Sequence, residues 1–269
     1  EQQNEKPENR AEALQYLLRA LELHTIGLGP KHPRTGQDLL RLARLYQQTP
    51  VLGVAPDVSA NRNDEDRAIE YFEQAIEVFR AVKGAHKVVG SVQHDLAVIP
   101  VARGDYPKAL GLLNESMSSY KSQDEDSGDD VGTTFAEMCI DVVQVWRNMG
   151  ECHMNLKDYE HAIECFTAAL DVQREARRRH DSGSCSDSSD LESAGEEKFS
   201  FLVHLIQMIS DESLADTLRR LGKAFCAAEK YKEALVVYKE AHQIHRAALQ
   251  QKSIPGRRAP LEIAAKQDQ

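Results

Sequence analysis

The feature that most limits the fold of this chain is a pattern of small and large apolar residues that recurs along it. Residues 143–169 and 215–241 carry the pattern with identical offsets, so that Gly150 corresponds to Gly222. In both segments the apolar residues recur every three or four positions on either side of a short turn. Because residues at this spacing share one face of an α-helix, each segment predicts a pair of amphipathic helices. A single pair leaves its apolar face exposed, and successive pairs must therefore stack on one another.

Two further copies of the pattern and a half copy precede these segments, around Ala109, Ala68 and Ala13. Small residues let the two helices of a pair approach closely, and large apolar residues fill the space between pairs. The small positions are Ala43, Ala97, Gly150 and Gly222 in the first helices, and Ala68, Ala109, Ala162 and Ala234 in the second helices. The predicted units, about four and a half helix pairs, are approximately 11–29, 35–83, 88–121, 134–178 and 213–250.

This pattern resembles the tetratricopeptide repeat, whose signature has Trp, Leu, Gly and Tyr in the first helix and Tyr, Ala, Phe and Ala in the second. The match is clearest at 143–176 and 215–248, and it covers roughly 11–252 apart from insertions. The resemblance implies an all-α fold, namely a right-handed solenoid of antiparallel helix pairs that forms a single domain at 1–252. Such repeats hold other proteins rather than catalyse reactions, and the fold by itself does not name the partner.

A narrower resemblance concerns the linker between the first two predicted helices. The sequence Leu-Gly-Pro-Lys-His-Pro at 28–33 looks like the linker of kinesin light chain repeats, in which Gly29 ends one helix and Pro33 begins the next. Kinesin light chains carry asparagines on the inner helices of successive repeats, and in this chain only Asn148 matches one of them. The other matching positions hold Arg41, Asp95 and Arg220. The sequence therefore predicts repeats of this type in a protein that is not itself a light chain.

Three insertions interrupt the repeats and a flexible tail follows them, at 47–63, 122–133, 180–209 and 253–269. The first insertion contains Pro50, Gly53 and Pro56, which predict a loop. After the second, Thr134 and Glu137 match a capping box, so the next helix is predicted to begin at Thr134 and to end near Asn155. Within the third, 199–209 is an apolar segment that predicts an extra helix, which either packs on the solenoid or forms an exposed docking patch.

The first helix of each pair is expected to line the concave surface of the solenoid. The positions predicted to line this groove are Arg41, Arg44, His94, Arg147, Asn148, Glu151, Arg219, Arg220 and Lys223. Six bases there face two acids, Asp95 and Glu151, although the whole chain has a net charge of −10. The groove is either a solvated face whose arginines pair with nearby acids, or a site for an acidic peptide in an extended or helical form. Arginine suits the second role because guanidinium groups form forked hydrogen bonds with carboxylates.

The acidity of the chain is concentrated in two insertions. The runs 124–130 and 181–197 hold five and six acids and no Lys or Arg, which leaves about +1 for the remaining residues. Such segments bury too little apolar area to fold by themselves, and the simplest expectation is a solvated linker. The alternative is that loop 181–197 lies in the chain's own basic groove and competes with a partner. Phosphorylation would strengthen this contact, and serines followed three positions later by an acid are Ser184, Ser189 and Ser193.

The sequence contains no motif that predicts catalysis. It lacks a Gly-rich phosphate loop, a Gly-x-Ser-x-Gly elbow, a His-Glu-x-x-His pair and a Cys-x-x-Cys pair. Histidines or cysteines cluster at 242–245 and 152–161, but neither cluster offers three or four converging ligands, so we expect no metal and no cofactor. His153 falls where the repeat has a packing aromatic, which favours a role in the core. Nucleic acid is a poor partner because the chain is acidic and no aromatic residues interleave with its bases.

These patterns together favour a non-catalytic scaffold or cargo adaptor that binds other proteins. Two alternatives remain open, a regulatory subunit or peptide sensor whose superhelix changes shape on binding, and a structural spacer in a larger assembly. The odd number of cysteines, five, has no disulfide-like spacing and predicts reduced thiols in the cytoplasm or nucleus. The apolar segment 199–209 is too short to insert across a membrane.

Overall fold

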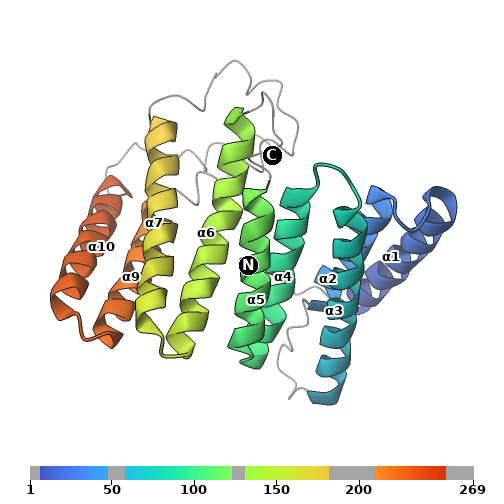
Figure 1. Cartoon of the computed structure of the whole chain (residues 1–269), viewed down its shortest axis with the longest axis horizontal. Helices are drawn as coiled ribbons and strands as arrows, with labels where there is room; N and C mark the ends of the chain where they lie inside the picture. Colours follow the sequence, from blue (N-terminus) through green and yellow to red (C-terminus); the bar gives the residue numbers. More distant parts are fainter. Residues whose placement is uncertain (1–6, 48–57, 123–130, 182–209, 253–269) are drawn as a thin grey trace. The chain divides into compact units, whose positions relative to one another are not determined.

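The computed structural model describes residues 7–47, 58–122, 131–181 and 210–252. These residues form α-helices joined by turns, and there is no strand among them (Figure 1). The predicted all-α fold of packed helix pairs is thereby confirmed. The chain divides into two compact units, Glu1–Gly128 and Asp129–Gln269. The single solenoid over 1–252 stays a prediction.

The first unit contains the described helices α1 (Pro7–Leu28), α2 (Pro33–Gln47), α3 (Val58–Arg80), α4 (His86–Arg103) and α5 (Tyr106–Lys121). The pairs are α2 with α3 and α4 with α5, while α1 packs on α2 and α3 packs on α4. Leu42, Phe72 and Val92 are fully buried between these helices. Burial of side chains of this size stabilises a fold by about 1.5–3 kcal/mol each.

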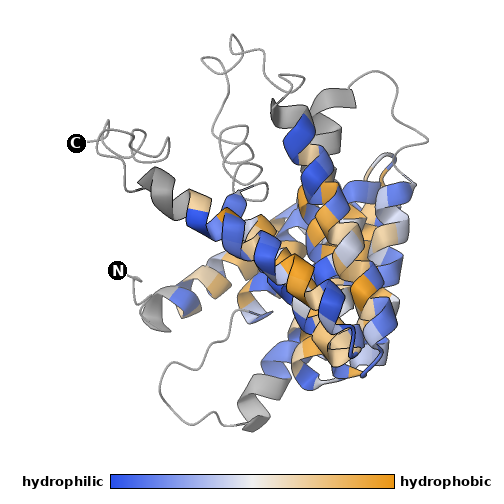
Figure 2. Cartoon of the chain, turned by 90° about the vertical axis from the view of Figure 1, so that its left-hand side faces the viewer, coloured by the Kyte–Doolittle hydropathy of each residue, from blue (hydrophilic) through white to orange (hydrophobic). Residues whose placement is uncertain are grey.

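The second unit contains the described helices α6 (Val131–Asn155), α7 (Tyr159–Asp181), α9 (Asp211–Ala227) and α10 (Tyr231–Lys252). Here α6 pairs with α7, α9 pairs with α10, and α7 packs on α9. Val143, Phe166 and Leu218 are buried in the core of this unit. The outer side of α10 carries apolar residues beside its charged ones (Figure 2), and its Leu235 and Val236 side chains are 54% and 65% exposed.

The linker at 28–33 ends and restarts the helices where the sequence predicts. Gly29 has a φ of 98°, a left-handed conformation that glycine adopts without strain and that ends α1 at Leu28. Pro33 begins α2, where its missing N–H removes no helical hydrogen bond. The Thr35 hydroxyl donates to the Gly29 carbonyl at 2.9 Å and ties the new helix to the turn.

Two glycines allow the helix pairs of the second unit to pack closely. A Cβ atom at Gly150 would lie 2.6 Å from Cε1 of Phe166, and a Cβ atom at Gly222 would lie 2.7 Å from Cζ of Tyr238. Both distances are shorter than a van der Waals contact, so each first helix approaches its partner at a point where a Cβ atom would force the facing ring to move. The predicted role of these small positions is therefore confirmed.

Helix bounds differ from the predictions by a few residues. α6 begins at Val131, before the predicted start at Thr134, and ends at the predicted Asn155. α3 begins at Val58, so its first turns lie within the predicted insertion 47–63. A capping sequence locates a helix start only to within about one turn. Neither α3 nor α6 has a proline at its first position, which would fix the start more closely. The extra helix at 199–209 and the tail at 253–269 lie outside the described residues.

Candidate peptide-binding face

The predicted groove residues lie on the first helices of the pairs, α2 and α4 in the first unit and α6 and α9 in the second. In the first unit α2 and α4 touch each other. In the second, ion pairs join α6 to α9. We call Arg147, Asn148, Glu151, Asp216, Arg219, Arg220 and Lys223 the α6–α9 face. The predicted groove residues of the first unit and the α6–α9 face differ in net charge.

In the first unit, carboxylates balance the charges of the two predicted groove arginines. Nε of Arg44 donates to Oδ2 of Asp95 at 2.8 Å. Arg41 lies 3.5 Å from the buried carboxylate of Asp38, three residues before it on the same helix. His94 Nδ1 lies 3.8 Å from Asp95. Both predicted groove arginines of this unit, Arg41 and Arg44, thus have a carboxylate beside them, which agrees with the expectation of a solvated face paired with nearby acids.

Asp216 is the centre of the α6–α9 face. Its carboxylate accepts hydrogen bonds from Arg219 at 2.6 Å, from Arg220 Nε at 2.9 Å, and from Arg147, which comes from the neighbouring helix. Arg220 also donates to the carboxylate of Glu151 on α6. The network connects α6 to α9 with charge-assisted bonds, the strongest class of protein hydrogen bond.

The pKa values on this face follow from its crowding. Burial acts to raise the pKa of Asp216, but the hydrogen bond and charge of Arg220, with the charges of Arg147 and Arg219, outweigh burial and lower it. Burial and the nearby charge of Arg220 lower the pKa of Arg147, whose side chain is only 14% exposed. An arginine titrates so far above neutral pH that Arg147 stays charged, and both partners keep their charges at pH 7.

The α6–α9 face retains an excess of two positive charges. Its cations are Arg147, Arg219, Arg220 and Lys223, and its carboxylates are Glu151 and Asp216. The excess is accessible at Arg219, whose side chain is 54% exposed, and at Lys223, which is exposed and forms no ion pair with any described residue. Asn148 lies half-buried on α6. Arg219 and Lys223 are four residues apart and share one side of α9.

Sequence reasoning missed two carboxylates, Asp38 and Asp216. Asp216 lies three and four positions before Arg219 and Arg220, and this helical spacing was the signal that could have found it. The same spacing relates Asp38 to Arg41. These acids reduce the basic excess that the sequence predicts: Asp38 removes it in the first unit, and Asp216 lowers it from three charges to two in the second.

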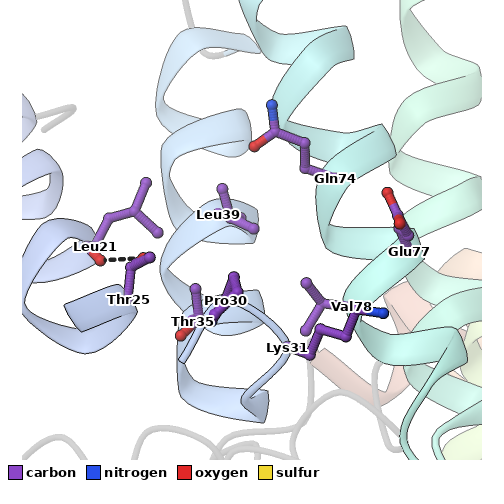
Figure 3. Close-up of a pocket in the computed structure, with 9 residues that line it drawn as sticks. All are labelled: Leu21, Thr25, Pro30, Lys31, Thr35, Leu39, Gln74, Glu77 and Val78. Carbon is purple, nitrogen blue, oxygen red and sulfur yellow. Dashed lines mark hydrogen bonds between the residues drawn. The ribbon is translucent and has the colours of Figure 1, made fainter. Parts of the chain in front are cut away.

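A separate cavity of about 290 Å³ lies in the first unit, between α1 and α3 and against α2 (Figure 3). Leu21, Leu39 and Val78 supply apolar walls. Lys31 and Glu77 are the only ionisable residues among those that line it. One lysine and one carboxylate do not form a catalytic set with a base-activated nucleophile.

The described cysteines are free thiols: Cys139, Cys152, Cys165 and Cys226. Burial raises the pKa of Cys152 to about 11 and that of Cys165 to about 12. Since a protonated thiol is neither a good nucleophile nor a metal ligand, these two residues act as small apolar side chains in the core. The predicted phosphorylation sites Ser184, Ser189 and Ser193 lie outside the described residues, so the contact of the acidic loop with the groove stays a prediction.

Sequence models of the tetratricopeptide repeat match most of the described helices. One matches 59–122, a second matches 143–175, and a third matches 8–34 and 214–254. The chain belongs to the tetratricopeptide repeat family. Tetratricopeptide repeats are protein-interaction modules and are typically non-catalytic, so the chain is a protein-interaction scaffold. No curated protein sequence matches it.

Solved tetratricopeptide repeat structures share the fold. Two crystal structures of the nearly identical TPR-like repeats of a putative kinesin light chain from Podosopora anserina are similar to this chain. The first has a TM-score of 0.54 at 16% identity and covers 90% of this chain and 89% of its own. The second has a TM-score of 0.53 at 15% identity, with coverage of 89% and 88%. At this identity the similarity concerns the fold.

None of the described helices of this tetratricopeptide repeat protein is both long and apolar enough to cross a bilayer.

Proposed function

We propose that this chain is a non-catalytic adaptor that binds an acidic peptide segment of a partner protein on the α6–α9 face. The observation that carries the proposal is the excess of two positive charges, exposed at Arg219 and Lys223, on a chain whose net charge is −10. The matching positions in the first unit have no such excess, so the proposal is limited to the second unit. The four described cysteines, which are free thiols, support a cytoplasmic or nuclear location.

The spacing of the two cations fits an extended peptide. Residues four positions apart on an α-helix are about 6 Å apart along its axis. Alternate residues of an extended peptide point the same way and lie about 7 Å apart. Acidic side chains at two alternate positions can therefore meet Arg219 and Lys223 together. The guanidinium group would accept a carboxylate in a forked arrangement, and the lysine would act as a point charge.

The ion pairs behind these cations prepare the face for binding. Glu151 and Asp216 hold Arg147 and Arg220 in place across α6 and α9. A side chain that is ordered before binding loses less conformational entropy when the ligand arrives. The inner arginines thus supply a fixed positive field, and the two exposed cations supply the direct contacts.

Charge reversal tests the proposal. We expect the double variant Arg219→Glu/Lys223→Glu to bind a short Glu-rich peptide about 10–100-fold more weakly than the wild type, because each exposed charge pair contributes up to about 1 kcal/mol and its reversal adds a repulsion of similar size. The measurement is isothermal titration calorimetry at physiological salt. Fluorescence anisotropy with a labelled peptide provides a second measurement.

The matched control is Lys232→Glu/Lys239→Glu on α10, which makes the same change in net charge at two exposed lysines elsewhere in the second unit. It should leave the affinity within about twofold, since long-range charge effects are screened at this ionic strength. Equal losses in the two double variants would mean that net charge, and not the α6–α9 face, attracts the peptide. No loss in either variant would also overturn the proposal.

A further inference from the structure

Two histidines and an aspartate meet at the turn between α6 and α7. His153 lies near the end of α6, Asp158 stands just before α7, and His161 lies in the first turn of α7. Nδ1 of His153 lies 3.1 Å from Oδ2 of Asp158, and Nδ1 of His161 lies 2.8 Å from the same oxygen. The imidazole rings are stacked, with centroids 5.3 Å apart and planes 22° from parallel. Two imidazole nitrogens therefore converge on one carboxylate oxygen, and the three residues together offer three ligand atoms.

The backbone of the turn fixes this arrangement. Lys157 adopts a φ of 61°, which reverses the chain after α6. The Asp158 N–H then donates to the carbonyl of His153 at 2.9 Å, which holds these two residues together. The Asp158 carbonyl accepts from the N–H of Ala162 at 3.1 Å as α7 begins. The positions of the three side chains thus follow from a helix end and a helix start that are both hydrogen-bonded.

We propose that His153, Asp158 and His161 form a binding site for one divalent transition metal ion of the Zn²⁺ class. Their ligand atoms all lie within 4.8 Å of one another. Zinc binds imidazole nitrogen and carboxylate oxygen at about 2.0–2.2 Å, which in a tetrahedral arrangement places neighbouring ligand atoms about 3.3–3.6 Å apart. The two nitrogen–oxygen distances, 2.8 and 3.1 Å, are shorter than this spacing by less than about 1 Å, so small rotations of the imidazole rings would open the site for the ion.

The donor set selects the class of metal. Two imidazoles and one carboxylate suit Zn²⁺, Ni²⁺ or Cu²⁺, whereas Ca²⁺ and Mg²⁺ prefer a shell of oxygen ligands. The thiol of Cys152, next to His153, is fully buried and is not among the three groups whose ligand atoms converge. Three protein ligands leave a coordination position for water or for a group from a partner.

The exposure of the three groups is consistent with metal entry. The His161 side chain is 62% exposed and that of Asp158 is 39% exposed, so an ion reaches them from solvent. The His153 side chain is 17% exposed and is fixed against the turn. This proposal is independent of peptide binding, because none of the three residues belongs to the α6–α9 face.

The test is titration of metal-free protein with Zn²⁺ in isothermal titration calorimetry. We expect the wild type to bind one Zn²⁺ per chain at this site, and His161→Gln and Asp158→Asn each to weaken that binding at least about tenfold, since even outer-shell changes cost metal sites 10–100-fold. Asparagine caps helices as well as aspartate does, so Asp158→Asn removes the anionic ligand without removing the cap. Titration with Mg²⁺ should produce no binding heat.

The control is His242→Gln, which removes an exposed histidine from α10 and should leave Zn²⁺ affinity unchanged. Absence of Zn²⁺ binding by the wild type would overturn the proposal. The same holds if His161→Gln and Asp158→Asn bind Zn²⁺ as tightly as the wild type, because the three residues would then serve only as a hydrogen-bonded helix cap.

Discussion

Replacing Gly150 with alanine is expected to lower the free energy of unfolding by about 1–3 kcal/mol, the usual cost of overpacking a well-packed core. The added Cβ would lie 2.6 Å from Cε1 and 2.7 Å from Cζ of Phe166. Phe166 is only 1% exposed, so its ring cannot move aside into solvent. The α6–α7 pair must therefore separate or the ring must leave its rotamer. Urea unfolding followed by far-ultraviolet circular dichroism measures the change.

Two other glycines provide the comparison. Gly222→Ala creates a similar approach to Tyr238, but that tyrosine is 37% exposed and its ring can move toward solvent, so the loss should be smaller. Gly111→Ala places a Cβ in open space on an exposed position of α5, where alanine should stabilise the helix by about 0.5–1 kcal/mol. If the Gly150→Ala variant were as stable as the Gly111→Ala variant, that result would contradict the close packing of α6 against α7 at Gly150.

Replacing Asp216 with asparagine is expected to change stability and binding in opposite directions. The variant leaves Arg147, which is 14% exposed, without its carboxylate partner, and we expect a loss of about 1–2 kcal/mol. The same change frees Arg219 and raises the excess charge of the α6–α9 face by one. The affinity for a Glu-rich peptide should therefore increase several-fold while the protein becomes less stable. Urea unfolding and calorimetric titration on the same sample measure both effects.

Asp95→Asn is the matched control in the first unit. Asp95 accepts a hydrogen bond from Arg44, whose side chain is 46% exposed, so the loss of stability should be smaller than for Asp216→Asn. Peptide affinity should not change, because Asp95 lies in the first unit. A weaker affinity in a folded Asp216→Asn variant would contradict the proposed role of the α6–α9 face.

Much of the fold could be predicted because its determinants are local. The spacing of apolar residues predicts the helices, Gly29 and Pro33 predict a helix boundary, and Gly150 and Gly222 predict close packing. Each of these signals depends on a few neighbouring residues or on a fixed offset between them. Helix starts such as that of α6 were less predictable, because capping preferences differ by only about 1 kcal/mol between neighbouring positions.

The candidate site was only partly predictable. The arginines of the α6–α9 face could be placed from the repeat, but their pairing could not, since Arg147 and Asp216 are 69 positions apart in the sequence. The ion pairs determine which cations remain available to a ligand. They reduce the predicted basic groove to an excess of positive charge at Arg219 and Lys223. The sequence alone shows that His153 and His161 lie on either side of one predicted turn. The position of Asp158 between their imidazoles depends on the turn geometry and became clear only in the structure.

Amide NMR shifts identify the residues of the chain that a bound acidic peptide contacts. The isotope-labelled chain would be titrated with a short Glu-rich peptide and, in parallel, with the same peptide carrying Gln in place of Glu. If the acidic peptide binds the α6–α9 face, the shifts are concentrated on α9 around Arg219 and Lys223 and on the facing part of α6 around Arg147, and the Gln peptide causes none. Shifts centred on Arg41 and Arg44 of α2, or equal shifts with both peptides, would contradict binding at this face.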